Sequence, residues 1–504
     1  MKKILSLVLA LVLVLSMAAF TTASAEADIV KLTWAQGTGS TAPLDNAMVL
    51  EELNKISVAE LGVEVDIQYF TDDQLQISIQ SGEVFDMYYT CDWYNNFARC
   101  VSQGLFADIT DKVKEWTPDL YATMPEYVWD LAKTSDGVLY AIPVKKDFAP
   151  INMLTYDLDF FNSIGMELPD RVEKMSELTP YLEAWKEAHP DRYPITVGGS
   201  PAGLDTTFDF IDRTINIGVH RAVDGTQDEV PVVISEFEDP VILDRWATMH
   251  AWYEAGLVNP DAPTLTEDAI ASKGKDHNHF TWTQAWNGYD WSSARDFAAD
   301  TVIYSGPYMS SAGVQGSMNA FSVTLEDDLA KFEKALKYQE LVNTNLKYRD
   351  TLRYGVEGYH WNYVDVPQTD GSVKQAVIRT EAGQENYGPW AFSQGSYSLA
   401  SISISEKNLD GTWAAPVLDQ WDLYFADVAT AKVSTIAGFM FDSSNWDSEY
   451  AEIQAIKSEY WNDLTCGVLD PEVAVPEILE KMRAAGLDDI IADCQAQLDA
   501  YLAK

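Results

Sequence analysis

The sequence predicts an α/β protein made of two lobes. The chain has 504 residues, more than one ordinary hydrophobic core holds, which indicates two or more domains. Apolar runs of strand length alternate with helical patterns along most of it, as in parallel α/β sheets. One apolar run, residues 138–142, ends at Pro143 and opens into a polar stretch. That change is expected where a chain leaves one lobe for another.

The first 25 residues have the layout of a secretory signal peptide. Lys2 and Lys3 precede an uncharged apolar run from Ile4 to Phe20, and small residues lead to an A-x-A site ending at Ala25. The alternative, a membrane anchor, needs about 20 apolar residues, and this run is shorter. We therefore predict cleavage after Ala25 and a soluble, exported mature chain. It has no Cys near the cleavage site to carry a lipid anchor.

The chain is strongly acidic, with a formal net charge of −44, and removal of Lys2 and Lys3 makes it about −46. This balance argues against nucleic acid or anionic lipid as a partner, because both require basic patches. Carboxylates this numerous also make any close acidic pair uninformative. Charge therefore excludes partners without nominating a catalytic site.

The four cysteines, Cys91, Cys100, Cys466 and Cys494, do not have the spacing of a zinc site. Export permits disulfides, so the pairs Cys91–Cys100 and Cys466–Cys494 stay open beside the alternative of buried thiols. Neither pair is interpreted as catalytic. We expect no metal and no cofactor.

The first predicted lobe begins with strands and helices in alternation. The pattern predicts strands over 28–34, 63–70 and 85–89, and helices over 44–61 and 75–80. Ligands of such sheets bind beyond the carboxyl ends of the strands. That rule selects Trp34, Gln36, Thr90, Asp92 and Trp93. Core packing is the alternative for each tryptophan, but Asp92-Trp93 is followed by Tyr94-Asn95-Asn96, a polar aromatic patch that suits a surface better.

The stretch from Asp136 to Asp147 contains the first predicted crossing. Asp136-Gly137 is a turn signal, and Pro143 ends the following strand because it cannot donate a ladder hydrogen bond. Lys145 and Asp147 come directly after it. We place them beside the crossing.

The pattern beyond the crossing predicts a second α/β lobe. Its expected strands are 154–161, 193–197 and 230–235, and its helices 176–189 and 240–255. Residues 305–316 are loop-like and are expected to hold a second crossing. A helix over 325–346, a hairpin over 362–379 around Asp370-Gly371, and helices from Asp447 onward complete the chain.

Three later stretches combine aromatic and polar residues: 280–291, 352–363 and 386–394. A sugar ring has an apolar face that stacks on indole, and hydroxyls that amide and hydroxyl side chains satisfy. Trp282 and Trp286 are also spaced for one face of a helix, which remains the alternative. The composition favours a neutral carbohydrate ligand but does not separate binding from hydrolysis. No nucleotide, hydrolase, metalloprotease or calcium motif is present.

Several segments together resemble the extracellular solute-binding proteins of ABC importers, of the maltose-binding type (family 1). They are Ser81-Gly-Glu-Val-Phe-Asp86, residues 104–110, and Asp136-Gly-Val-Leu-Tyr-Ala-Ile-Pro143 followed by Tyr156-Asp157. Residues 349–361, with Tyr354-Gly-Val-Glu-Gly358, are similar to the LplA-like branch, which carries an additional C-terminal region. Tyr387-Gly-Pro-Trp390 and the last helices fit that region.

The resemblance implies a bilobal periplasmic-binding-protein-like fold and no enzymatic activity. It divides the chain into a signal peptide (1–25), lobe 1 (28–143 and 311–350) and lobe 2 (144–310, then 351–504 with the C-terminal region). A carbohydrate, expected to be an oligosaccharide, would be carried to a membrane permease by a monomer that is secreted or held at the cell surface, or periplasmic in a Gram-negative source. A secreted glycosidase and a surface sensor or adhesin are the alternatives. The implied cleft residues are Trp34, Gln36, Thr90, Asp92, Trp93, Lys145, Asp147, Trp282, Trp286, Tyr359, Trp361 and Trp390.

Overall fold

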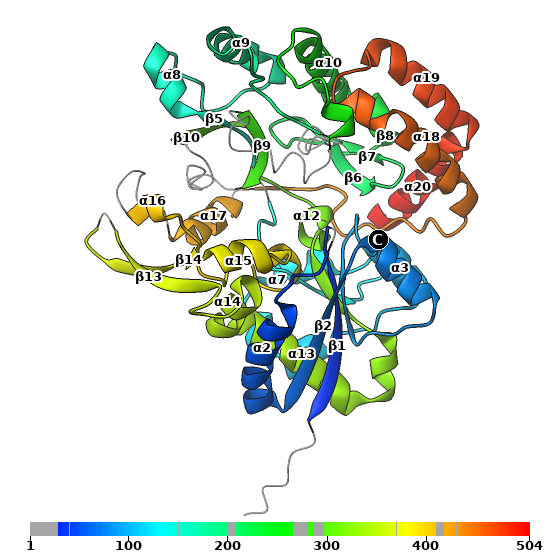
Figure 1. Cartoon of the computed structure of the whole chain (residues 1–504). Helices are drawn as coiled ribbons and strands as arrows, with labels where there is room; N and C mark the ends of the chain where they lie inside the picture. The colour runs from blue at the N-terminus through cyan, green and yellow to red at the C-terminus, as the bar shows by residue number, and fades with distance from the viewer. Residues whose placement is uncertain are drawn as a thin grey trace, which may run out of the picture.

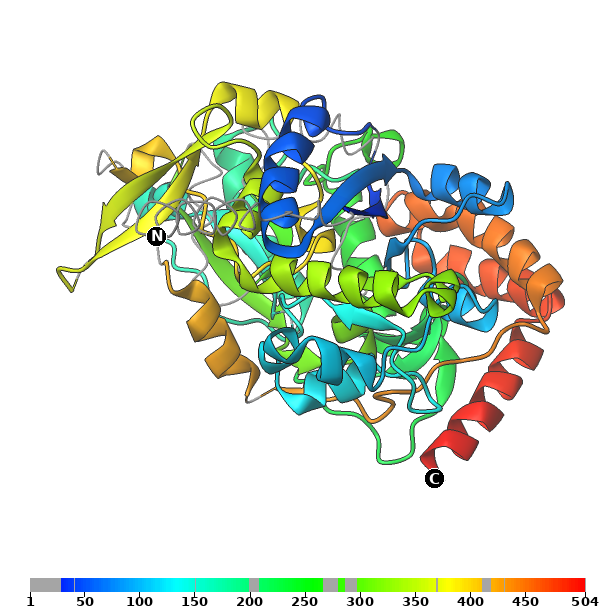
Figure 2. The same cartoon turned by 90° about the horizontal axis from the view of Figure 1, so that it is seen from below.

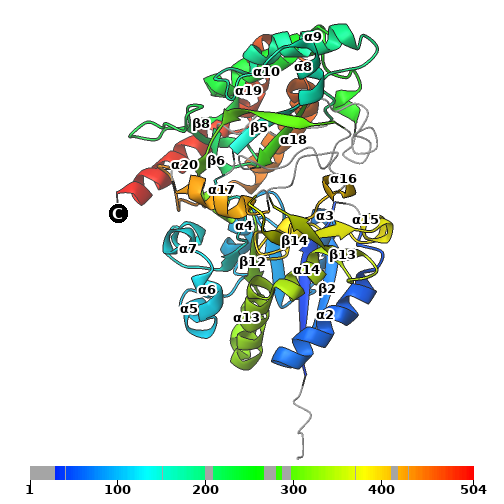
Figure 3. The same ribbon diagram turned by 90° about the vertical axis from the view of Figure 1, so that its left-hand side faces the viewer.

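A computed structural model of the chain describes residues 29–39, 41–149, 151–198, 208–265, 280–285, 297–368, 370–409, 418–429 and 431–503. For residues 282–285, 407, 408 and 427 it describes the backbone alone. The expected signal peptide lies outside these ranges. Figures 1 and 3 show two lobes, one above the other. No helix within the described ranges is long and apolar enough to cross a membrane.

The first lobe is built on a five-stranded sheet in the order β2-β1-β3-β12-β4. β1 pairs in parallel with β2 and β3, whereas β12 runs antiparallel to β3 and β4. The predicted strand–helix alternation is therefore confirmed. The strands are β1 Val30–Gly37, β2 Val63–Phe70, β3 Met87–Thr90, β4 Ala141–Pro143 and β12 Met318–Phe321.

Pro143 lies where its missing N–H costs least. β4 is an edge strand, and Pro143 is its last residue, opposite Met318. A proline at a strand end on a sheet edge interrupts no central ladder. The predicted strand that ends at Pro143 is confirmed, although it is only three residues long.

Alternation along β1 produces two faces, each with its own core. Leu32 and Trp34 pack in the larger core with Val49 and Phe332, whereas Ala35 belongs to a smaller core on the other face. The helices of this lobe are α2 Asn46–Leu61, α3 Asp72–Gln80, α4 Phe97–Ser102, α5 Lys112–Trp116, α6 Pro118–Ala122, α7 Glu126–Ala132, α12 Ser311–Gln315, α13 Leu329–Thr344 and α14 Leu346–Tyr354.

Within the described ranges, the second lobe combines two three-stranded sheets with six α-helices. The sheets have the orders β10-β5-β9 and β6-β7-β8, and all their pairs are antiparallel. The expected strand 193–197 forms only isolated bridges, from Ile195 to Val258 and Phe280. The elements are β5 Ile151–Asp157, α8 Leu158–Ile164, α9 Thr179–Ala188, β6 Phe208–Asp212, β7 Ile217–His220, β8 Val233–Ser235, α10 Pro240–Glu254, β9 Phe280–Ala285, β10 Ala299–Ser305, α18 Asp447–Thr465, α19 Pro471–Ala484 and α20 Leu487–Leu502.

Three connections join the lobes. The first follows β4, the second contains β11 (Tyr308–Met309) and the third contains β15 (Lys432–Val433). β11 and β15 pair in parallel, so the second and third connections form one short ribbon. Tyr308 ties this ribbon to the second lobe, because its hydroxyl donates to Asp209 Oδ2 at 2.8 Å.

The cores divide the chain differently from the expected domains beyond residue 350. Leu352, Tyr387, Trp421 and Tyr424 belong to the larger core of the first lobe, and the second-lobe core takes up the chain again only at Ile436. The reason is that the third connection lies at β15, about eighty residues later than the expected boundary. The first lobe thus also holds β13 Trp361–Pro367, β14 Val373–Arg379, α15 Glu381–Asn386, α16 Glu406–Leu409 and α17 Gln420–Val428. Figure 2 shows the β13–β14 hairpin and α20 at opposite ends of the molecule.

Candidate functional site

Four of the expected ligand residues are buried inside the first lobe: Trp361, described below, and three residues of β1 and β3. Trp34, Gln36 and Thr90 are fully buried. Trp34 Nε1 and Gln36 Nε2 both donate to Asn319 Oδ1, at 3.1 and 3.2 Å, and Thr90 Oγ1 donates to the carbonyl of Asn95 at 2.5 Å. The strand-end rule selected these side chains as ligand contacts, but other segments cover them and satisfy their polar groups.

Asp92 and Trp93, two and three positions beyond β3, are at the surface. Trp93 is 48% exposed, and Asp92 Oδ2 is 2.8 Å from Nε of Arg213, in the turn between β6 and β7 of the second lobe. Arg213 also lies over the ring of Phe210, at 4.0 Å. Because Asp92 reaches the second lobe, the Trp93 loop is on the face of the first lobe that is turned toward the second.

Trp93 is joined there by Trp390 and Phe392, from a turn nearly three hundred residues later in the chain. The Trp93 ring is 5.5 Å from Trp390 and 6.2 Å from Phe392, and Trp390 and Phe392 stack at 5.6 Å. Buried Tyr89 and Tyr94 lie against them. We call Trp93, Trp390 and Phe392 the aromatic surface.

The aromatic surface keeps its indole N–H groups available. Among the residues that the structure describes, none accepts a hydrogen bond from Nε1 of Trp93 or Trp390. An edge-exposed indole with a free N–H is able to stack on an apolar face and donate to a hydroxyl. Of the expected site residues, Trp93, Trp390 and Asp92 are therefore brought together on one face.

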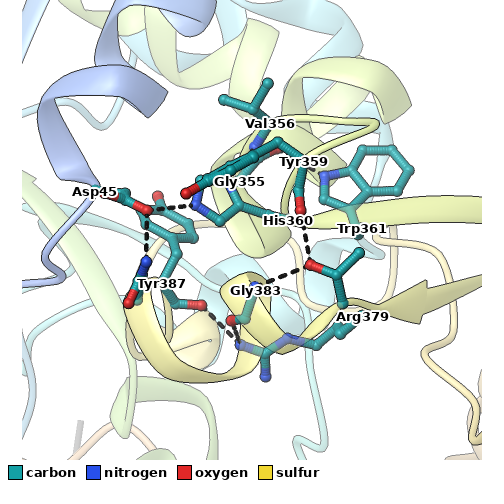
Figure 4. A network of polar contacts seen from close by, with 11 residues as sticks. Asp45, Gly355, Val356, Tyr359, His360, Trp361, Arg379, Gly383 and Tyr387 are labelled. Atoms are coloured by element: carbon teal, nitrogen blue, oxygen red, sulfur yellow. Dashed lines mark hydrogen bonds and ion pairs between the residues drawn. The ribbon is translucent and has the colours of Figure 1, made fainter.

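Tyr359 and Trp361 belong to a different group of contacts, on either side of His360 (Figure 4). Trp361 is fully buried and its Nε1 donates to the carbonyl of Gly355 at 2.7 Å. Between them, His360 accepts from Val356 N–H at 2.9 Å through Nδ1, and its Nε2 is 3.1 Å from Asp45 Oδ2. Tyr359 is 46% exposed and its ring contacts His360. Trp361 thus supports the fold, and nothing here joins Tyr359 to the aromatic surface.

Lys145 and Asp147 follow the first crossing as expected. Lys145 Nζ lies over the ring of Phe425 in α17, 4.9 Å from its centroid, and burial lowers the pKa of Lys145. Asp147 pairs with its neighbour Lys146 at 3.2 Å. The Lys145 ammonium therefore packs on an aromatic ring, whereas that of Lys146 pairs with a carboxylate.

The predictions for Trp282 and Trp286 stay open. The backbone of Trp282 belongs to β9, paired with Leu154 of β5, so the helix-face alternative does not hold for it. Its side chain, and the whole of Trp286, lie outside the described residues.

All four cysteines are buried and none is in a disulfide, so neither candidate disulfide is formed. Burial raises the pKa of the Cys91, Cys100 and Cys466 thiols to about 12, which leaves them as inert thiols. Within the described ranges, no group of three His, Cys, Asp or Glu residues is placed to hold a metal ion.

Comparisons with known proteins agree with this architecture. A carbohydrate ABC transporter substrate-binding protein of Streptococcus pneumoniae serotype 4 (strain ATCC BAA-334 / TIGR4) is 23% identical over 461 residues, 90% of this chain and 88% of the relative. The crystal structure of the N-glycan transport solute binding protein NgtS from Streptococcus pneumoniae superposes with a TM-score of 0.76 at 22% identity, covering 94% of this chain and 99% of that one. The chain has the fold of ABC-importer solute-binding proteins. The NgtS complex with Man5GlcNAc superposes with a TM-score of 0.73 at 22% identity, over 94% and 98% of the two chains.

Within this solute-binding fold, the C-terminal helices form a separately recognised region. Residues 435–503 match a family model described as a domain of unknown function (DUF3502). They comprise the segment after β15 and helices α18 to α20. The fold class and the resemblance predicted from the sequence are confirmed.

Two residues of the site were not selected from the sequence. Phe392 lies inside the aromatic stretch 386–394, so its composition was a usable signal. Arg213 had none, because only the folded chain brings the β6–β7 turn to Asp92.

Proposed function

We propose that this protein is the substrate-binding component of an ABC importer, and that it captures an oligosaccharide between its lobes and delivers it to a membrane permease. The observation that carries the proposal is the aromatic surface: two tryptophans and a phenylalanine, partly exposed, on the face of the first lobe that Asp92 links to the second. Sugar rings stack on such surfaces. The relatives named above are carbohydrate or N-glycan transport proteins.

The lobes and their connections suit capture by closure. Each lobe has its own core, and the three connections are short, so the lobes can rotate about the β11–β15 ribbon while each stays intact. We propose that Lys145, on the first connection, donates to a ligand hydroxyl. Trp282 of β9, together with Trp286, is proposed as the opposing wall from the second lobe.

The proposal includes a location and a mode of action. Substrate-binding proteins of ABC importers work outside the cytoplasmic membrane, and we propose that this one is exported by its leader and acts as a monomer near its permease. We assign it no catalytic role. Incubation with oligosaccharides should release no new reducing ends, and their release would support the glycosidase alternative.

Calorimetry against a panel of neutral oligosaccharides tests the central proposal, with a peptide and a phosphorylated lipid head group as controls. At least one glycan should bind more tightly than roughly 1 mM, an affinity equivalent to about −4 kcal/mol, while the controls do not bind. If a control ligand binds and no glycan does, the carbohydrate assignment fails. Trp93→Ala and Trp390→Ala should each weaken glycan binding by about tenfold, which is the size of one lost aromatic contact.

A further inference from the structure

The turn that carries Trp390 and Phe392 is held by buried side chains of the first lobe. Ser393 Oγ donates to Gln36 Oε1 at 2.6 Å, and its carbonyl accepts from Asn319 Nδ2 at 3.0 Å. The carbonyl of Phe392 accepts from Ser317 Oγ at 2.6 Å. Gln36, one of the four expected ligand residues that are buried, thus contacts the turn that carries the aromatic surface.

Arg349 of α14 is the strongest of these attachments. It is fully buried and donates to the carbonyls of Ala391 at 2.7 Å and Ser396 at 2.8 Å, and to Gln394 Oε1 at 3.5 Å. All three acceptors are neutral. Burial lowers the pKa of Arg349 to about 10.

A buried charge whose bonds end on neutral carbonyls is costly where packing alone is needed. The planar guanidinium fork, however, fixes the relative positions of several acceptors at once. Its acceptors in residues 391 and 396 bracket the turn. The Arg349 side chain therefore links the two ends of this turn.

Gly37, at the end of β1, lies directly against the Trp390 indole. A Cβ on Gly37 would lie 2.6 Å from Cε3 and Cζ3 of Trp390, too close for the ring to keep its place. A Cβ on Gly39 would lie 3.7 Å from Trp390, an ordinary contact. Of these two glycines, only Gly37 must lack a side chain for Trp390 to keep its place.

We propose that Arg349 and Gly37 are positioning residues for ligand binding: they hold Trp390 against Trp93 and so set the shape of the aromatic surface without touching the ligand. The part of this inference that concerns affinity rests on the proposed function. The part that concerns the placement of Trp390 does not.

The placement is tested without ligand by ¹⁹F NMR of protein labelled with 5-fluorotryptophan. Trp93→Phe, Trp390→Phe and Trp361→Phe assign the three resonances. Arg349→Met and Gly37→Ala should shift the Trp93 and Trp390 signals and leave the Trp361 signal in place. Arg349→Lys, which keeps a donor at this site, should restore part of the wild-type position.

Two matched variants control for unspecific effects. Gly39→Ala adds the same methyl group two residues away, and Arg353→Met removes a guanidinium from the next turn of α14, where Arg353 donates to the Tyr397 hydroxyl. Both should leave the Trp93 and Trp390 signals unchanged. The proposal is overturned if Gly37→Ala folds and leaves both signals at their wild-type positions, since this variant keeps the charge network intact.

Affinity for the best glycan of the panel then separates the two proposals. Arg349→Met and Gly37→Ala should each weaken binding by about tenfold, and neither should weaken it further in a Trp390→Ala background, because a residue that acts through Trp390 has no effect once the ring is gone. Additive losses would contradict positioning. If no glycan binds the wild type, the proposed function fails. The NMR measurement still decides whether Arg349 and Gly37 position Trp390, because it needs no ligand.

Discussion

Two aromatic regions of the first lobe differ in what their indole N–H groups contact. Trp361 is fully buried between Tyr354 and Tyr363, and its Nε1 donates to the carbonyl of Gly355. In the aromatic surface, Trp93 is half exposed, and no described residue accepts from its Nε1 or from that of Trp390. A buried polar group is satisfied within the protein, whereas one at a binding surface is left for the ligand. Hydrogen bonding of the indole N–H, more than local composition, thus distinguishes buried Trp361 from Trp93 and Trp390.

Truncating the buried indole is expected to have the largest effect on stability. Trp361→Ala should lower the free energy of unfolding by about 3–5 kcal/mol, because it leaves a cavity and an unpaired Gly355 carbonyl. Urea denaturation measures this. Trp390→Ala, made in parallel, should cost clearly less stability while weakening glycan binding. Equal losses of stability in the two variants would remove the distinction between the regions.

A variant of Lys145 tests whether the first crossing contributes to ligand binding, like the aromatic surface, or to stability, like the core. Lys145→Met should weaken glycan binding by about 1.5–3 kcal/mol if its ammonium donates to the ligand, and should not reduce stability at pH 7. The folded state binds this proton less tightly than the unfolded state, since burial lowers the pKa below 10.5. The wild type should therefore gain stability relative to the variant as pH rises through the lowered pKa toward 10.5. Thermal unfolding of both proteins from about pH 8 up to the usual lysine pKa of about 10.5 checks whether the wild type gains stability relative to the variant.

The ion pair between Asp92 and Arg213 joins the aromatic surface to the second lobe and should have a smaller effect. Both side chains are about a third exposed, so a coupling of only about 0.2–1 kcal/mol is expected in a double-mutant cycle with Asp92→Asn and Arg213→Gln. Added salt should reduce it. A coupling of zero at low salt would indicate that the lobes do not depend on this contact.

The smallest expected effect on stability is that of Asp224, whose carboxylate accepts a hydrogen bond from Lys432 of β15. Hydrogen bonds from the Thr226 hydroxyl and N–H, and then the Lys432 ammonium, lower the pKa of Asp224 to about 2. The contribution is present above the unfolded pKa of 3.8 and is lost as pH falls toward 2. Asp224→Asn should thus melt at a slightly lower temperature than the wild type at about pH 6. The melting temperatures of the two proteins should converge as the pH approaches 2. A difference that persists there would rule out the charge as its cause.

Much of the first lobe was predictable because its local signals agree with one another. Alternation in 28–34 and 63–70 and the helical spacing between them predict β1, α2 and β2 before any tertiary contact is considered, although β1 itself continues to Gly37. The same logic ended β4 at Pro143 and located the β13–β14 hairpin at Asp370-Gly371. The candidate site was predicted only in part: Trp93 and Trp390 meet, but Trp34, Gln36, Thr90 and Trp361 are buried.

The sequence by itself determined the two-lobed α/β fold, the first crossing and the surplus of aromatic residues, because backbone propensities and apolar periodicity are local. Tertiary structure decided which aromatics are exposed, where the first lobe ends, and which turn carries Trp390. Those outcomes depend on contacts between residues such as Gly37, Arg349 and Trp390, which are more than three hundred positions apart at the extremes. No pattern within a short window contains information about what will cover a given side chain.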